Sequence, residues 1–280
     1  MRAPAARAKS ALPCAAVRVV DLDRDMRDVI PTGAGRDSEF LFQRMTERTL
    51  ALAGAAPGRR LLDVASGFGQ DARALAAQDA LVVAAEPSAR MSALARGLDV
   101  EQAELRVLHL RSWADALPFA AGSFDAVICK GALDHFDAPE DAIREMARVT
   151  RPRGRVVLAI ANFDSAACRL AHAGDVLRET LLGRVLPRGR RHYDVPHDHF
   201  TRYELPLMRE QAGAHLHLEV TEGISLAWGL RAWARLVERL PAPVAQGVLV
   251  GLDALARKLP GLADVVLIAG RPRRSSSNSA

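Results

Sequence analysis

One nine-residue segment, LLDVASGFG from Leu61 to Gly69, constrains the fold of this chain more than any other feature. A short apolar run ends in a Gly-x-Gly turn, and a helical pattern begins directly afterwards at Asp71. Glycine at Gly67 and Gly69 lets the backbone approach a ligand closely, where a Cβ atom would intrude. The helix that follows offers free N–H groups and positive potential to an anionic group. The segment therefore predicts a strand–turn–helix unit built around a ligand.

The chain on either side of this unit repeats the strand–helix alternation, which predicts a doubly wound α/β fold. Continuous Val, Leu, Ile and Ala runs are typical of parallel strands that are buried on both faces. The expected strands cover residues 60–65, 81–85, 105–110, 124–129, 155–160, 216–220 and 263–269. The expected helices cover residues 38–53, 71–77, 88–96, 139–149, 203–212, 226–240 and 244–259. Ser38 is the expected N-cap of the first helix, and Gly213 is expected to end the fifth. Together they predict a seven-stranded, mostly parallel sheet whose last strand runs antiparallel.

An acidic residue, Glu86, follows the second predicted strand. Strand carboxyl ends line the ligand crevice of a doubly wound sheet, and a carboxylate there can accept two hydrogen bonds from a ribose diol. The unit is therefore interpreted as a nucleoside-binding half-domain. Gly67, Gly69 and Ala72 also fit the GxGxxA fingerprint of dinucleotide-binding proteins, so an NAD-dependent oxidoreductase is an alternative.

Composition narrows the function classes. The chain has 280 residues, of which 49% are hydrophobic and 25% charged, and this excludes a fully disordered or fibrous protein. Lysine plus arginine (38) exceeds aspartate plus glutamate (33), so the net charge is +5. The arginines are scattered rather than gathered in one segment, which argues against a nucleic-acid partner.

Cysteine spacing and hydropathy indicate the compartment. The three cysteines, Cys14, Cys129 and Cys168, show neither paired nor metal-type spacing, so no disulfide scaffold or zinc site is expected. No apolar run reaches the roughly 18 residues of a membrane span, and no signal-peptide pattern follows the N-terminus. These patterns predict a cytoplasmic protein with no membrane partner. Residues 1–16 and 275–280 are expected to be disordered tails.

Three segments in the first half of the chain resemble a known family. LLDVASGFGQDARALA, VVAAEPSARM and ALPFAAGSFDAVICKGALDHFDAPEDAIREMARVTRPRGRVVLAI are similar to the class I S-adenosylmethionine-dependent methyltransferases, and most closely to the type 11 small-molecule subgroup. The resemblance covers residues 60–161 and keeps the family's motif order throughout. It implies a Rossmann-like methyltransferase fold, the cofactor S-adenosylmethionine, the product S-adenosylhomocysteine and a small-molecule acceptor.

The resemblance also implies roles for individual residues. Asp63 and the backbone from Ala65 to Gly69 would face the methionine end of the cofactor, and Glu86 would hold its ribose hydroxyls. Met91 would pack on the adenine, and the backbone at Cys129 and Lys130 would lie along the methionine moiety. The remaining cofactor contacts implied by the resemblance are Ser66, Gly67, Pro87, Trp113 and Ala114.

Three positions depart from the family pattern. Ala65 replaces a common glycine, Trp113 stands where an adenine-binding aspartate is frequent, and Arg153 replaces the first glycine of a PGG turn. In an alternative arrangement, Trp113 would stack on the adenine and the Ala114 N–H would donate to a ring nitrogen. Because of these departures, a non-catalytic protein that retains the methyltransferase fold is a further alternative.

The predicted organisation is a single methyltransferase domain over residues 17–274, with a cofactor-binding core at 55–161. Insertions at 162–200 and 225–260 are expected to form a helical cap over the strand carboxyl ends and to supply the acceptor pocket. The large apolar cap predicts an apolar or specialised-metabolite acceptor. O-methylation is expected ahead of N- or C-methylation.

Methyl transfer needs mainly the alignment of two reactants, and it needs a base only where the acceptor carries a proton. His135, just past the fourth strand, is the predicted base, because neutral imidazole can accept a proton near pH 7. A structural histidine that bonds the loop is the alternative. The segment HYDVPHDHF supplies Tyr193, His197 and His199 as predicted acceptor contacts, or a loop that orders the cap. Its spacing matches no standard metal site, so no metal is expected.

Overall fold

Seven apolar segments pair into one sheet in the order β3-β2-β1-β4-β5-β7-β6. This computed structural model describes residues 35–100, 105–183, 191–195 and 199–273; the two expected tails and His197 lie outside these ranges. The strands are β1 (Arg60–Val64), β2 (Leu81–Ala85), β3 (Val107–Leu110), β4 (Phe124–Lys130), β5 (Thr150–Ala161), β6 (Leu216–Ile224) and β7 (Val265–Pro272). The helices are α1 (Arg36–Ala53), α2 (Gln70–Ala76), α3 (Ala89–Val100), η2 (Leu133–His135, a 3-10 helix), α4 (Pro139–Val149), α5 (Ala166–Leu182), α6 (Leu205–His215), α7 (Arg231–Arg239) and α8 (Ala242–Lys258).

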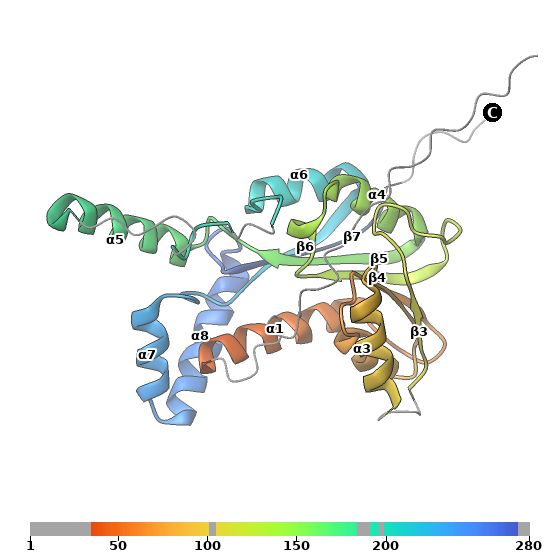
Figure 1. Cartoon of the computed structure of the whole chain (residues 1–280), viewed down its shortest axis with the longest axis horizontal. Helices are drawn as coiled ribbons and strands as arrows, with labels where there is room; N and C mark the ends of the chain where they lie inside the picture. The colour runs from red at the N-terminus through yellow and green to blue at the C-terminus, as the bar shows by residue number, and fades with distance from the viewer. Residues whose placement is uncertain (1–34, 101–104, 184–190, 196–198, 274–280) are drawn as a thin grey trace, which may run out of the picture.

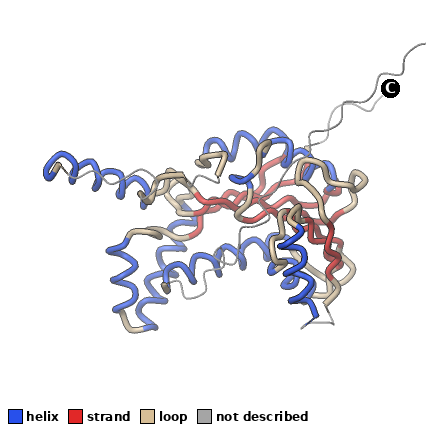
Figure 2. Tube along the Cα trace, in the orientation of Figure 1, coloured by secondary structure: helices blue, strands red, loops and turns tan. Residues whose placement is uncertain are grey.

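Strand direction follows the predicted topology. β1, β2, β3, β4 and β5 pair in parallel, whereas β7 runs antiparallel to both β5 and β6. Parallel neighbours need long crossover connections, which the intervening segments supply on the two faces of the sheet. The predicted seven-stranded, mostly parallel sheet with an antiparallel last strand is confirmed. Figure 2 shows the strands as one continuous band with helices above and below it.

Side-chain alternation along each strand builds two apolar layers. Leu61, Ile128 and Val157 pack in the layer that includes α1 and α2. Leu62 follows Leu61 on β1 and is paired with Val127 on β4. Both pack in the layer that includes α4 and α6. Because successive residues of a strand point to opposite faces, a run that is apolar at every position is covered on both sides. The parallel strands are therefore held as a rigid central platform.

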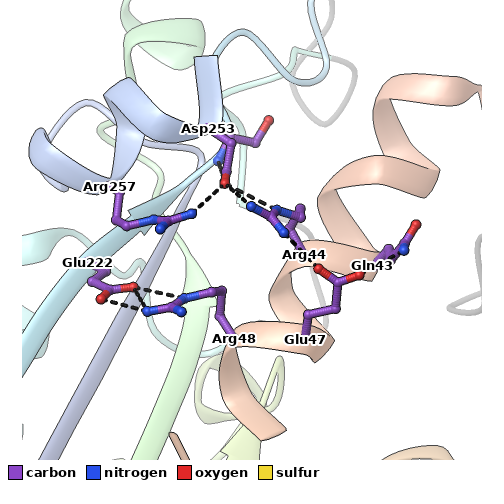
Figure 3. A network of polar contacts seen from close by, with 8 residues as sticks. Gln43, Arg44, Glu47, Arg48, Glu222, Asp253 and Arg257 are labelled. Atoms are coloured by element: carbon purple, nitrogen blue, oxygen red, sulfur yellow. Dashed lines mark hydrogen bonds and ion pairs between the residues drawn. The ribbon is translucent and has the colours of Figure 1, made fainter. Parts of the chain in front are cut away.

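A polar network joins α1 to the C-terminal half of the chain (Figure 3). The Arg44 guanidinium donates to Asp253 Oδ2 on α8 from Nε (3.2 Å) and Nη2 (3.0 Å), and Arg257 Nη2 donates to the same oxygen at 3.1 Å. Arg48, one turn further along α1, donates to both carboxylate oxygens of Glu222 on β6. These charged contacts hold α1 against α8 and the sheet edge.

Two helix ends differ from the sequence-based expectation. Helix α1 begins at Arg36 with Gly35 as its N-cap, so Ser38 is not the cap. The Ser38 hydroxyl instead accepts a hydrogen bond from Trp228 Nε1 at 2.9 Å. Helix α6 continues through Gly213 to His215, because this glycine stays helical and the chain turns extended only at the following leucine.

The segment after β5 holds a helix whose bounds the sequence pattern did not predict, although a helical cap was expected in this region. Ser165 caps α5 by accepting a hydrogen bond from Cys168 N at 3.2 Å. Figure 1 shows α5 extending away from the sheet, and only Ala167 and Cys168 of this helix are buried. Helix α7 is shorter than expected and begins at Arg231, so Trp228 precedes it.

Candidate functional site

The turn after β1 uses the backbone conformations that its glycines permit. Ala65, Gly67 and Gly69 all have positive φ, at 56°, 54° and 76°. A side chain at Gly67 would point toward Met91, whose Cε lies 3.7 Å from an added Cβ. Left-handed backbone is accessible to glycine at little cost, and Ala65 adopts it with a small side chain. The turn thus brings successive main-chain groups to the carboxyl edge of the sheet.

Glu86, directly after β2, joins this turn. Its Oε2 accepts a hydrogen bond from Gly67 N and its Oε1 accepts one from Ser88 N, both at 2.9 Å. The side chain is buried, and burial raises the pKa of the carboxyl, while the two backbone N–H groups act in the opposite direction. An ionised carboxylate has about four acceptor positions, so two remain for a ligand diol.

A second acidic residue lies beneath the turn. Asp63 is buried, and burial raises the pKa of its carboxyl well above the usual range; the Asp71 charge acts in the same direction and Lys130 opposes it. Lys130 Nζ donates to Asp71 Oδ1 at 2.8 Å and to Thr46 Oγ1 at 2.6 Å. Lys130 therefore ties β4 to α1 and α2, which the sequence did not indicate.

Two side-chain oxygens at this edge are buried and lack a hydrogen-bond partner among the described residues. Within the described part of the chain, Asp63 Oδ2 and Ser66 Oγ have no hydrogen-bond partner. Buried polar atoms are almost always paired, so these two oxygens are the kind of group that a bound polar molecule satisfies. A carboxylate, a hydroxyl and the Glu86 acceptor positions fit a nucleoside that carries an amino group and a ribose diol.

Of the residues implied for the adenine end, Pro87, Trp113 and Ala114 follow β2 or β3, and Met91 lies at the start of α3. Met91 is buried, and its N–H donates to Ser88 Oγ at 3.2 Å. The Pro87 carbonyl accepts from Arg111 Nε and Nη2, both at 3.2 Å. Trp113 is partly buried, and Ala114 beside it packs on the apolar layer of α4 and α6. Arg111, which the sequence reasoning missed, therefore positions the turn that follows Glu86.

Just after β4, the predicted base His135 lies next to His199, which is distant in the sequence. The His135 and His199 rings lie 4.2 Å apart between centroids. His199 Nε2 lies 2.9 Å from Asp134 Oδ2, and His135 Nε2 lies 3.9 Å from Asp134 Oδ1. Ligand-type atoms of the three side chains all lie within 4.8 Å of one another. Asp134, which sequence reasoning missed, is thus the centre of a compact polar cluster.

Tyr193 lies on the outer side of this cluster. Its ring packs edge-on against His172 at 4.9 Å, and its carbonyl accepts from Arg202 Nη1 at 2.9 Å. Arg202 Nη2 also donates to the Phe163 carbonyl, and the Phe163 ring faces His199 at 6.3 Å. Arg202 therefore connects the Tyr193 segment to the histidines.

Cys129, whose backbone is implied in cofactor contact, has a fully buried side chain. Burial raises the pKa of its thiol, and the charges of Asp63 and Asp134 raise it further. A thiol held neutral in this way packs as an apolar group and is a poor nucleophile.

Comparison with known proteins assigns the chain to a family. A family model described as a methyltransferase domain matches residues 62–158. The ubiquinone biosynthesis O-methyltransferase of Xanthomonas euvesicatoria pv. vesicatoria (strain 85-10) is 33% identical over 178 residues, or 62% of this chain and 68% of that protein. The same-named protein of Xanthomonas oryzae pv. oryzae (strain PXO99A) is 35% identical over 136 residues, or 49% of this chain and 55% of that protein. The chain thus spans about half the length of several curated relatives that it matches.

Solved structures share the fold at low sequence identity. Magnesium protoporphyrin IX methyltransferase from Synechocystis PCC 6803 has a TM-score of 0.56 and 16% identity, with 85% of this chain and 86% of that chain covered. The [4+2]-cyclase SpnF has a TM-score of 0.52 and 21% identity, with 82% and 81% covered. Among the helices of the described residues, none is long and apolar enough to cross a bilayer. From the matched domain and the aligned Xanthomonas relatives it follows that this chain belongs to the class I S-adenosylmethionine-dependent methyltransferases.

Proposed function

We propose that this protein transfers a methyl group from S-adenosylmethionine to a hydroxyl oxygen of a small organic acceptor. The observation that carries the proposal is the set of buried side-chain oxygens around the Gly67 turn, in a chain that belongs to the methyltransferase family. Asp63 Oδ2 and Ser66 Oγ lack partners among the described residues, and Glu86 keeps two acceptor positions. These groups fit the amino group and ribose of the cofactor.

The cofactor residues divide by the part of the molecule that they would hold. Asp63, Ser66 and the backbone of Ala65, Gly67 and Gly69 would bind the methionine end, with the backbone of Cys129 and Lys130 beside it. Glu86 would accept from the ribose hydroxyls. The adenine would be held by Pro87, Met91, Trp113 and Ala114. When bound, S-adenosylmethionine supplies a methyl group on a positively charged sulfur, which keeps the bonding electron pair when the methyl leaves.

Two observations support an oxygen acceptor. The Xanthomonas relatives are named ubiquinone biosynthesis O-methyltransferases. A hydroxyl must also lose its proton during the reaction, and His135 and His199 offer imidazoles beside the buried Asp134 carboxylate. The Phe163 ring faces His199 and favours an apolar or aromatic acceptor. The predicted cap, residues 162–200 and 225–260, is part of this proposal, as are the predicted contacts from Tyr193, His197 and His199.

The fold alone does not decide that methyl transfer occurs, because the similar SpnF structure is that of a [4+2]-cyclase. The test is calorimetric titration with S-adenosylhomocysteine, with NAD as a parallel control, followed by an acceptor screen. We expect micromolar binding of S-adenosylhomocysteine alone and the gain of one methyl group on a phenol or catechol, detected by mass spectrometry. Binding of NAD alone would overturn the cofactor assignment, and cofactor binding without turnover would favour the non-catalytic alternative.

A further inference from the structure

The Asp134 carboxylate lies between two imidazoles that come from distant parts of the chain. Its side chain is 4% exposed, whereas those of His199 and His135 are 18% and 33% exposed. Oδ2 contacts His199, and Oδ1, which has no hydrogen-bond partner among the described residues, faces His135 at 3.9 Å. A buried carboxylate oxygen without a partner is costly, and the cost falls when a cation forms beside it.

We propose that Asp134, His199 and His135 act as one proton-accepting unit, in which His135 takes the proton and the other two residues position it. This inference rests on the proposed methyl transfer to a hydroxyl. The acceptor O–H bond breaks, its proton passes to an imidazole nitrogen of His135, and the oxygen keeps the electron pair that takes the methyl group. The imidazolium then faces Asp134 Oδ1. His135 is the member that meets the acceptor because it is the most exposed of the three.

Asp134 contacts His199 through its side chain and the following residue, Phe200, through its main chain. The side chains meet at 2.9 Å, and the Asp134 carbonyl accepts from Phe200 N at 2.7 Å. The main chain that carries His199 is therefore anchored to the η2 turn that carries Asp134 and His135. His199 is a positioning residue, because its contact with Asp134 fixes the orientation of the carboxylate that faces His135.

Asp134 is a carboxylate that lies beside both imidazoles, and three further groups lie close to this cluster. Cys129 on β4 and Tyr203 before α6 are buried; burial raises the pKa of both groups, and the Asp134 charge acts in the same direction. On the outer side, the Phe163 ring faces His199, and the Arg202 guanidinium lies over that ring at 5.7 Å from its centroid. Cys129 and Tyr203 are thus held neutral and Arg202 is a cation, so these three groups do not compete with Asp134 for the proton.

The experiment compares His199→Asn, Asp134→Asn, His135→Asn and the double variant of both histidines. His217→Asn is the matched control, because this histidine is exposed on β6. Steady-state rates are measured across pH with the best acceptor of the screen. In parallel, the histidine ring protons are titrated by NMR in the complex with S-adenosylhomocysteine, which requires no turnover.

We expect His199→Asn and Asp134→Asn to lower kcat at least tenfold while leaving the affinity for S-adenosylhomocysteine unchanged. The double histidine variant should be within about threefold of His135→Asn, because residues that act as a unit are not additive. In Asp134→Asn the NMR signals of the His135 ring protons should change with pH differently from those of the wild type, since the protonated ring loses its counter-ion. His217→Asn should keep the wild-type rate.

The proposal is overturned if His199→Asn keeps the wild-type kcat, or if its loss multiplies with that of His135→Asn. It is also overturned if a chelator abolishes turnover and a divalent ion restores it, because the three side chains would then be metal ligands. A wild-type protein that binds S-adenosylhomocysteine but methylates no acceptor contradicts the proposed function instead. In that case the NMR titration decides: a pH response of the His135 ring protons that changes in both Asp134→Asn and His199→Asn supports the unit, and an unchanged one refutes it.

Discussion

Removing the Glu86 carboxylate tests the ligand edge of the sheet most directly. Its two oxygens each accept one backbone N–H at 2.9 Å, from Gly67 and Ser88, which holds the side chain in one orientation. The acceptor positions that remain are the ones proposed for the ribose diol. Hydrogen bonds to a charged group contribute about 1.5–3 kcal/mol, so Glu86→Ala should weaken S-adenosylhomocysteine binding roughly 10- to 150-fold.

The assay is calorimetric titration of wild type, Glu86→Ala, Glu86→Gln and the control Glu210→Ala, in which an exposed residue of α6 is removed. Glutamine keeps the shape but turns an amide N–H toward a backbone donor, so it should also weaken binding. Circular dichroism and Tm show whether each variant is folded. A folded Glu86→Ala protein that binds within twofold of wild type would remove Glu86 from the site and refute the reasoning.

The pH dependence of binding gives a second measure of the same residue. Burial raises the pKa of Glu86, so the carboxylate takes up a proton at a higher pH than an exposed glutamate would. The protonated form has lost acceptor capacity, and affinity should therefore fall as the pH drops through this raised value. Glu86→Ala should show a weaker decline than wild type; equal declines would assign the pH effect to another group.

Three further predictions concern stability, each measured by urea denaturation. Asp253→Asn removes the negative charge that contacts both Arg44 and Arg257 (Figure 3). It should lower the free energy of unfolding by about 2–3 kcal/mol. This loss is smaller than that for a fully buried ion pair, because both arginines are partly exposed. Glu47→Gln, at a half-exposed partner, should cost less than about 0.5 kcal/mol, and equal losses would contradict this account. Gly223→Ala would place a Cβ 2.3 Å from the Ala256 carbonyl oxygen and should cost about 3 kcal/mol or more, whereas Gly247→Ala, with no atom within 4 Å, should stabilise α8 by up to about 1 kcal/mol. Burial raises the pKa of Asp264 to about 7, so its neutral form stabilises the fold at low pH and that contribution is lost as the pH rises toward 7. Asp264→Asn should therefore flatten this part of the plot of unfolding free energy against pH. An unchanged slope would show that another group causes the pH dependence.

The elements that carry strong local patterns were predictable. The apolar run, the Gly67 and Gly69 turn and the acid at the end of β2 are contiguous or regularly spaced, so the sheet could be inferred without coordinates. The ligand edge stays a prediction. Element ends were less predictable where side chains had competing partners. Ser38 bonds Trp228 rather than capping α1, and Gly213 remains inside α6. The chain neighbours of Ser38 and Gly213 do not predict these two outcomes.

The sequence by itself determined the central sheet, the glycine turn and the candidate ligands of the cofactor, because strand burial and turn conformation depend on residues that are neighbours in the chain. Only the tertiary structure decided that Lys130 bonds Asp71 and Thr46. It also decided that His199 meets Asp134 and His135, although α4, β5 and α5 lie between the two segments in the chain. Contacts of this kind depend on how connections return over the sheet, and a one-dimensional pattern does not encode which distant side chains a crossover brings together.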